Sequence, residues 1–488
     1  MSKHNRTNIL IFMTDQQQAQ VTLPGHPCRT PNLDRIARDG IRFTNAYPPM
    51  AHCCPARASF MTGLYPSQHG IYNNVSNEQA ICRSLKPGVE TFSEKLKEAG
   101  YQLFFSGKWH VSATENPKDR GWEELHVNAG VGAYMGIHRD KWRENKAQID
   151  EDLSAASRKK GEIVRPGWGN VQLYGTSPKA LQELGDYRVV RKGIEQLDRL
   201  KDGEKPWCLY IGVTGPHDPF IIPEKYATMY SPDDIELPPN YNDTLTDKPA
   251  LYRRMRKVFD ILSEQEVKES IAHYWGYCSM IDDLFGEVVD ALQRNEQLDN
   301  TLVLFLSDHG EHAGAHGLYA KGLSHFDEGY RVPLVAHCPG LIKSPGKTVE
   351  HFVTLMDIAP TLIDVAGASK LNKCSGASLM PFFDDAEPDG WRESVYAQCN
   401  GVEVYYTSRM VRTNQYKFVY HPTDIDELYD VRNDPYEMNN LAELPEMASL
   451  KKEMYQRMWR HAFQSEDTIF NKYVTVATAD YGPGIADL

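Results

Sequence analysis

Four apolar runs stand out along the chain, and within each of them apolar and polar side chains do not alternate. They occupy residues 8–14, 101–106, 207–214 and 301–307. Continuous runs of this length are typical of strands buried on both faces, as in a parallel sheet covered by helices. Helical patterns lie between them, at residues 31–39, 91–99 and 271–292. The pattern therefore predicts an α/β fold in which helices sandwich a large, mostly parallel sheet.

The pattern changes toward the C-terminus, where short β-type segments replace the long apolar runs. Residues 416–420 and 427–431 have this character, and a helical pattern follows at residues 446–463. A chain of 488 residues is also longer than one ordinary hydrophobic core requires. We therefore expect a large α/β domain at residues 1–385 and a smaller α+β subdomain at residues 386–488, built from an antiparallel sheet and a helix.

The composition indicates a soluble globular protein, since 41% of the residues are hydrophobic and 24% are charged. Lys and Arg total 53 against 66 Asp and Glu, which gives a formal net charge of −13. This balance argues against nucleic acid as the main partner. Any anionic substrate must therefore be held by a local cluster of cations.

Nine cysteines are spread over the whole length, without a CxxC or zinc-ligand spacing. This odd number fits a reducing compartment better than a disulfide framework. The apolar run from Ile9 to Met13 is too short for a signal peptide, and no stretch approaches the length of a membrane span. We expect a cytoplasmic protein with no membrane partner, or a periplasmic or secreted one if a leader has been removed. Nothing in the sequence indicates the oligomeric state.

Side chains suited to catalysis or metal binding follow directly after all four apolar runs. In chain order they are Asp15, Lys108, His110, His217, Asp308 and His309. In open α/β sheets, ligands bind outside the carboxyl ends of the strands. A single strand that ends in Asp is ordinary, because Asp is common in turns. Four such strand ends together predict a site at this edge of the sheet.

Further candidate chemistry lies in the segment HCCPARASFMTG, which begins at His52. Cys53 comes just before Pro55 and a run of good helix formers, so we expect it at a helix N-terminus. Unpaired N–H groups and the helix dipole favour negative charge there. Arg57, one turn further on, adds a permanent cation suited to oxyanions. Alternatively, Cys53 and Cys54 are simply small buried residues.

Read as Cys53-x-Pro55-x-Arg57 and extended through Gly63, this segment resembles the signature of the type I sulfatases, which belong to the alkaline-phosphatase-like superfamily. The resemblance extends over residues 8–440. It implies an alkaline-phosphatase-like fold, oxidation of Cys53 to formylglycine by a formylglycine-generating or other maturing enzyme, and a role for Arg57 in steadying this nucleophile. A formylglycine hydrate has two hydroxyls on one carbon: one attacks sulfur, and deprotonation of the other releases sulfate.

One divalent cation has a candidate site at Asp15, Asp308 and His309, with Gln16 offering an amide oxygen. Hard oxygen donors suit Ca²⁺ or Mg²⁺, and one imidazole also permits Mn²⁺. The resemblance implies that Cys53, once modified, joins this site and that the ion is most often Ca²⁺. Asp15-Gln16 and Asp308-His309 are variants of the commonest family pattern, which has two Asp first and Asp-Asn second. Alternatively, Asp308 caps a helix and His309 occupies a turn.

The resemblance also implies roles for residues that carry other family motifs. Lys108 and His110 match the pair that binds the sulfate and removes the proton of the second hydroxyl. His217 matches the histidine beside the leaving oxygen, and Lys321 matches the lysine on the sulfate and the leaving group. Asn74 matches an asparagine that contacts the sulfate, with an ordinary turn residue as the alternative.

Two further groups of residues have open interpretations. His312 and His316 are spaced like a zinc-binding pair on one helix face. Neighbouring glycines disfavour a regular helix, so we predict that these histidines are loop residues near the site. Residues 112–200 are polar and short of strand signals, and we expect them to decorate the large domain. Aromatic residues of this region would either contact substrate or only pack the insertion: Trp142, Trp168 and Tyr174.

Together these features predict a sulfuric ester hydrolase that cleaves a sulfate monoester, either a sulfated sugar or a small aryl or alkyl sulfate. A phosphonate monoester or phosphodiester hydrolase of the same superfamily is the first alternative, although such relatives generally lack the pair Lys108 and His110. Two-zinc diesterases would leave the motif at Cys53 unexplained. A catalytically silent sulfate- or glycan-binding protein would require the loss of a core residue, and none is lost.

Overall fold

The structure is a computed structural model. It describes residues 6–77, 80–128, 158–165, 169–386, 388–402, 404–468, 473 and 475–487. Trp142 and Trp168, for which the sequence left substrate contact open, lie outside the described residues.

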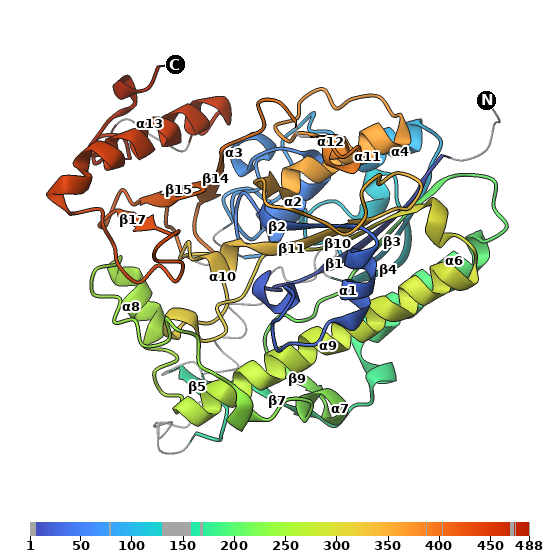
Figure 1. The fold of residues 1–488 in the computed structure, drawn as a ribbon, viewed down its shortest axis with the longest axis horizontal. Coiled ribbons are helices and arrows are strands. Elements are labelled where there is room, and N and C mark those ends of the chain that lie inside the picture. Colours follow the sequence, from blue (N-terminus) through green and yellow to red (C-terminus); the bar gives the residue numbers. More distant parts are fainter. Residues whose placement is uncertain are drawn as a thin grey trace.

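A central sheet organises the large domain, and it contains nine strands in the described part of the chain (Figure 1). Its order is β12-β2-β11-β10-β1-β8-β3-β4, with β13 paired to β2. The strands are β1 (Asn8–Thr14), β2 (Ile41–Tyr47), β3 (Gln102–Lys108), β4 (Glu123–Asn128), β8 (Trp207–Gly212), β10 (Thr301–Ser307), β11 (Val332–His337), β12 (Lys347–Val349) and β13 (Val353–Thr354). The four apolar runs are β1, β3, β8 and β10, which lie side by side and parallel, as the sequence predicts.

Helices cover both faces of this sheet because alternate side chains of the central strands enter two separate cores. Ile9, Ile11 and Met13 of β1 belong to one core, and Leu10 and Phe12 belong to the other. The helices of the first core are α2 (Cys53–Thr62), α4 (Phe92–Glu98) and α11 (Ile358–Ala366). Those of the second core are α1 (Pro31–Arg38), α6 (Gly185–Leu200) and the long α9 (Glu264–Arg294), seen below the sheet in Figure 1.

The C-terminal part forms a separate antiparallel sheet of four strands within the described residues. These are β14 (Ser394–Cys399), β15 (Ser408–Thr413), β16 (Tyr416–Tyr420) and β17 (Glu427–Asp430). Helix α13 (Ala448–Gln464) packs Tyr455 and Trp459 against this sheet. The predicted antiparallel sheet with a helix is confirmed, whereas the boundary at residue 385 stays a prediction.

A buried ammonium ties this sheet to the large domain. Lys417 of β16 places Nζ 2.7 Å from Asp327 Oδ1 and 2.6 Å from Glu437 Oε1. Asp327 begins the short helix α10 (Asp327–Tyr330), which follows the loop that carries Lys321. The C-terminal sheet is therefore anchored close to the predicted site.

The expectation that residues 112–200 only decorate the domain is wrong for two of their elements. Strand β4 extends the central sheet, and α6 packs Val189 and Leu197 against it. The sequence conceals β4 because its side chains are largely polar and only partly buried. Tyr174 is 5% exposed and donates a hydrogen bond to Glu269 Oε2 of α9 at 2.7 Å, so it packs the insertion.

The remaining α-helices and strands of the described chain are short. They are α3 (Pro66–His69), β5 (Glu162–Arg165), β6 (Gly169–Gln172), β7 (Tyr174–Ser177), β9 (Phe220–Pro223), α7 (Glu224–Ala227), α8 (Ala250–Arg256) and α12 (Met380–Phe383). Among the described helices, none combines the length and the apolar character that crossing a bilayer would require. The cellular compartment stays a prediction.

Candidate active site

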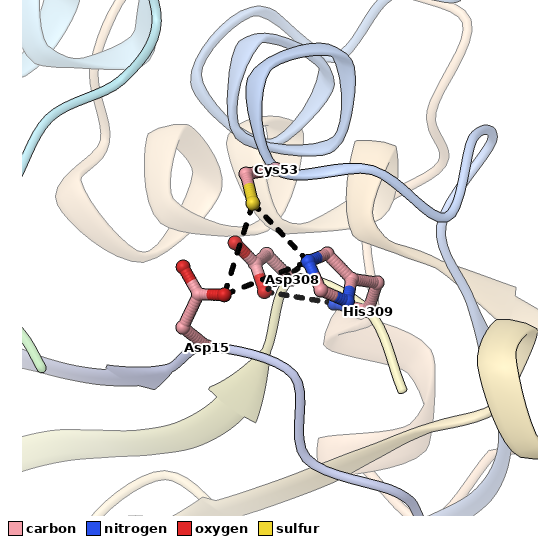
Figure 2. Close-up of side chains that lie close together, drawn as sticks. All are labelled: Asp15, Cys53, Asp308 and His309. Carbon is pink, nitrogen blue, oxygen red and sulfur yellow. Dashed lines mark hydrogen bonds and ion pairs between the residues drawn. The ribbon is translucent and has the colours of Figure 1, made fainter. Parts of the chain in front are cut away.

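Four side chains from three distant segments meet where the central strands end (Figure 2). Asp15 follows β1, Asp308 and His309 follow β10, and Cys53 is the first residue of α2. Their potential ligand atoms all lie within 4.8 Å of one another, and all four residues are buried. Cys53 Sγ is 3.2 Å from His309 Nε2 and 3.7 Å from Asp15 Oδ1. The strand ends therefore converge as the sequence predicts.

Helix α2 presents residue 53 to this cluster. His52 has an extended backbone with φ −149°, so the chain turns into the helix at Cys53. The side chain of residue 53 thus lies at the positive end of the helix dipole, among N–H groups without helical partners. Gly63 ends the helix with φ +69°, a left-handed conformation that glycine adopts without strain.

Arg57 bridges the two carboxylates of the cluster. Its Nε donates to Asp308 Oδ2 at 2.7 Å, and one terminal nitrogen donates to Asp15 Oδ2 at 3.0 Å. The other terminal nitrogen donates to the Lys108 carbonyl at 3.1 Å and to the Tyr210 hydroxyl at 2.9 Å. Every guanidinium nitrogen has a partner, so Arg57 fixes both carboxylates beside the nucleophile position.

Cations surround residue 53 and favour negative charge there. Burial would raise the pKa of the Cys53 thiol, but Lys108, Lys321 and His309 outweigh it and hold this pKa well below its ordinary value. Burial likewise opposes ionisation of Asp15, yet Lys108, at 2.5 Å from its Oδ2, and other cations keep its pKa low. The site is therefore suited to an anionic nucleophile and an anionic substrate.

His110 lies next to this cluster in a form that can accept a proton. Burial, and then the charge of Lys108, lower the pKa of His110. Its Nε2 is 3.3 Å from Ser76 Oγ. An imidazole that stays neutral near pH 7 is suited to general-base catalysis.

The cluster fits a hard divalent cation. Asp15 and Asp308 offer carboxylate oxygens, and one imidazole completes a donor set compatible with Ca²⁺, Mg²⁺ or Mn²⁺. His309 Nδ1 lies 2.9 Å from the Gly310 carbonyl, where it donates a hydrogen bond. This contact leaves Nε2, which faces the carboxylates, as the nitrogen that would bind a cation after losing its proton.

A second group of predicted residues lies beside the cluster. Lys321 Nζ is 2.5 Å from His217 Nε2 and 2.5 Å from Gln16 Oε1. His217 Nδ1 donates to the Asp218 carbonyl at 2.7 Å, so its Nε2 accepts from Lys321. In this arrangement one lone pair of the Gln16 oxygen accepts from Lys321, and the second could still bind a cation. The role of Gln16 as a metal ligand stays a prediction.

Comparison with known proteins decides the family. The family model described as Sulfatase matches residues 6–368, and one described as N-sulphoglucosamine sulphohydrolase, C-terminal, matches residues 314–464. This chain belongs to the sulfatase family.

Curated relatives agree with this assignment, and a solved structure shares the fold. A choline-sulfatase from Rhizobium meliloti is 30% identical over 90% of this sulfatase and 83% of its own length. An N-acetylglucosamine-6-O-sulfatase from Bacteroides thetaiotaomicron is 26% identical over 95% and 87%. The fold is shared with the phosphonate monoester hydrolase of Agrobacterium radiobacter, with a TM-score of 0.77, 24% identity and coverage of 94% and 96%. The protein is thus a member of a family of sulfate-ester hydrolases with an alkaline-phosphatase-like fold.

Three residues that support the sulfatase site were not predicted from the sequence. Asp218 Oδ1 accepts from Gln16 Nε2 at 2.8 Å, and Glu311 Oε2 accepts from the same nitrogen. Burial, with the charge of Asp218, raises the pKa of Glu311 to about 7. The third residue, Tyr210, lies inside the apolar strand β8 and accepts a hydrogen bond from Arg57. Adjacency in sequence was the available signal for two of them, since Asp218 follows His217 and Glu311 comes two residues after His309.

Asn74 lies half-buried near the nucleophile segment of the sulfatase. Its Oδ1 accepts from Cys54 Sγ at 3.4 Å and from the Ser76 backbone N–H at 3.1 Å. The second contact is a local turn of the kind that Asn often forms. A contact with sulfate stays a prediction.

His312 and His316 are buried loop residues with other partners. His312 Nε2 is 2.8 Å from Ser324 Oγ, and His316 Nδ1 is 2.7 Å from Asp243 Oδ2. His316 has φ +53°, which no regular helix contains. Among the residues that the structure describes, the one group of His, Cys, Asp and Glu close enough to hold an ion contains neither histidine. The loop prediction is confirmed, and the helical zinc pair is excluded.

Proposed function

We propose that this sulfatase hydrolyses a sulfate monoester, either a sulfated sugar or a small aryl or alkyl sulfate, with Cys53 converted to formylglycine by a maturing enzyme. One divalent cation, Ca²⁺ in the first instance, would be held by residue 53, Asp15, Asp308 and His309, with the Gln16 amide oxygen as a further ligand. The observation that carries the proposal is the position of Cys53 at a helix N-terminus within 4.8 Å of these carboxylate and imidazole atoms.

The two absent groups would supply complementary chemistry. Formylglycine hydrate provides one hydroxyl for attack on sulfur and a second whose deprotonation releases sulfate. A bound cation lowers the pKa of a hydroxyl and offsets charge on sulfuryl oxygens.

The side chains of the protein would perform the remaining tasks. Lys108 donates to the sulfuryl oxygens, and neutral His110 accepts the proton of the second hydroxyl. Lys321 and His217, joined by a short hydrogen bond, face the leaving oxygen and provide its proton. Arg57 keeps both carboxylates in place. The family resemblance implies these roles, and the position of the residues beside the cluster supports them.

Similarity supports a sugar as one candidate substrate. The relative from Bacteroides thetaiotaomicron is named an N-acetylglucosamine-6-O-sulfatase. The relative from Rhizobium meliloti is named a choline-sulfatase, which makes small alkyl sulfates equally reasonable test compounds. We therefore propose a screen that includes both classes.

Hydrolysis of phosphonate monoesters or phosphodiesters is the second candidate, because the same fold occurs in a phosphonate monoester hydrolase. Lys108, within 2.5 Å of Asp15, favours sulfate transfer, since such hydrolases generally lack the pair Lys108 and His110. The test uses mature enzyme with defined sulfated sugars, small sulfate esters and phosphodiesters. Higher kcat/KM for a phosphodiester than for every sulfate ester would contradict the proposal, and absence of turnover would favour a silent binding protein.

A further inference from the structure

Glu311 lies beside the catalytic groups, but the proposed function gives it no task. Its carboxylate is buried and accepts three hydrogen bonds. Oε1 accepts from the backbone N–H groups of Ala313, at 2.9 Å, and Ala320, at 2.7 Å. Oε2 accepts from Gln16 Nε2. Glu311 thus links Gln16 to two points of the loop before Lys321, the backbone of Ala313 and that of Ala320.

The orientation of the Gln16 amide depends on two carboxylates. Its Nε2 lies between Glu311 Oε2 and Asp218 Oδ1, and only an N–H group can bond to both. A flipped amide would place its oxygen against these carboxylates and its NH₂ against the Lys321 ammonium. With both carboxyl groups ionised, none of those contacts is a hydrogen bond, because carboxylates only accept and ammonium groups only donate. Oε1 therefore faces Lys321.

Lys321 depends in turn on this amide oxygen. Its Nζ has two acceptors at 2.5 Å, Gln16 Oε1 and His217 Nε2. Lysine has a flexible side chain, so its ammonium is placed by its acceptors rather than by its stem. Loss of the Gln16 oxygen would remove one of the two supports.

We propose that Glu311 is a positioning residue, which orients the Gln16 amide so that its oxygen holds the Lys321 ammonium at the reacting group. This inference rests on the proposed function, because it concerns the same site. Glu311 acts through Gln16 and does not touch substrate. Its other oxygen closes the loop, so the structural task and the positioning task belong to different atoms.

The isosteric variant Glu311→Gln separates these tasks. The amide oxygen of the variant can still accept from the loop N–H groups. Its NH₂ group then faces the NH₂ group of Gln16, and two donors cannot form a hydrogen bond with each other. We expect a folded enzyme whose kcat/KM falls about 10–100-fold, as is typical when an outer partner of an active-site ligand is lost. The loss should appear mainly in kcat, because Lys321 acts on charge that develops in the transition state.

Glu427→Gln provides the matched control. Glu427 is a buried glutamate of the C-terminal sheet and accepts from the hydroxyls of Tyr252 and Tyr429. We expect this variant to lose thermal stability as Glu311→Gln does, but to keep wild-type kcat. Equal kcat losses in both variants would reduce Glu311 to a structural residue and overturn the proposal.

A double-mutant cycle tests whether Glu311 acts through Gln16. If Glu311 acts only through Gln16, Glu311→Gln should change kcat/KM by less than about threefold in a Gln16→Ala background. Independent effects of the two substitutions would add in full. A repeated 10–100-fold loss would overturn the proposal.

An exchange of the two side chains keeps the test decisive if Glu311→Gln alone is unstable. Gln16→Glu alone places a third carboxylate beside Asp218 and Glu311. When Glu311→Gln is added, the new amide at position 311 can donate to the carboxylate at position 16. The double variant should be more active than Gln16→Glu alone. Lower activity of the double variant would contradict the inference.

These variants are compared on whichever ester the wild-type enzyme hydrolyses, phosphodiesters included. Wild-type activity on phosphodiesters alone would overturn the proposed function and still allow the cycle to be measured. Sulfate-ester activity without coupling between positions 16 and 311 would overturn only the role of Glu311. A wild-type protein inactive on every ester would overturn both.

Discussion

Replacement of Arg57 by Met tests how the site tolerates two buried carboxylates. The Arg57 side chain is 1% exposed and pairs with Asp308 at 2.7 Å and Asp15 at 3.0 Å. Arg57→Met keeps an apolar stem of similar length but leaves both carboxylates without this cation. Removal of one partner from a buried ion pair costs about 3–5 kcal/mol of the free energy of unfolding.

This cost translates into a measurable change in melting temperature. An unfolding entropy of about 2.1 cal/mol/K per residue gives about 1 kcal/mol/K for 488 residues. Arg57→Met should therefore lower Tm by about 3–5 °C in scanning calorimetry. Arg409→Met is a matched control, because Arg409 is equally buried and pairs with Asp467 at 2.5 Å, in the C-terminal part. It should lose similar stability and keep its activity, whereas Arg57→Met should be nearly inactive.

The response to a chelator distinguishes a site effect from a general loss of packing. A ligand that binds only the native state stabilises it, so chelation should lower the Tm of the wild-type enzyme. Chelation should lower the Tm further in Arg57→Met, because the divalent cation then compensates more of the negative charge of Asp308. Arg409→Met should respond as the wild type does. An unchanged Tm in Arg57→Met, or a chelator effect no larger than in the wild type, would refute this reasoning.

Three other predictions concern the chemistry. Cys53→Ala should fold and be inactive, and peptide mass spectrometry of mature wild-type enzyme should show an aldehyde at residue 53 and a thiol at Cys54; full activity of Cys53→Ala would exclude the proposed nucleophile. His110→Ala should release one equivalent of alcohol in a rapid burst and then turn over about 10²–10⁴-fold more slowly, as when a general base is lost; a slow first turnover would place His110 in the earlier step. Lys108→Ala should lower kcat/KM more for sulfate monoesters than for phosphodiesters, because it removes a cation from the developing charge; equal losses would argue against a site specialised for sulfate.

The central strands were predictable because their burial is complete. Every residue of β10 and all but the first of β1 are buried, so an unbroken apolar run is their natural signature. The end of β3 was harder to predict, because Gly107 and Lys108 continue the strand beside β4. Their polar character looked like a strand end, although the backbone pairing extends to Lys108.

The groups that surround residue 53 could be predicted from the sequence, whereas the residues that hold these groups in place could not. Asp15 and His309 stand directly after recognisable strands. Gln16, by contrast, is held by Asp218 and Glu311, which are 202 and 295 residues away in sequence. Tyr210 reaches Arg57 from the middle of an apolar strand. Pairings of this kind depend on the register of strands that meet only in the folded chain.

The Lys417 contact sets a limit on exchanging parts among relatives. Its ammonium is 0% exposed and is shared between Asp327, on the catalytic side, and Glu437, on the C-terminal side. A chimera that joined this catalytic part to a foreign C-terminal sheet without an equivalent cation would bury Asp327 without its ammonium partner. Recombination breakpoints between the two parts should therefore be tolerated only when the acidic and basic partners are transplanted together. For exchange experiments, the two parts form one electrostatic unit.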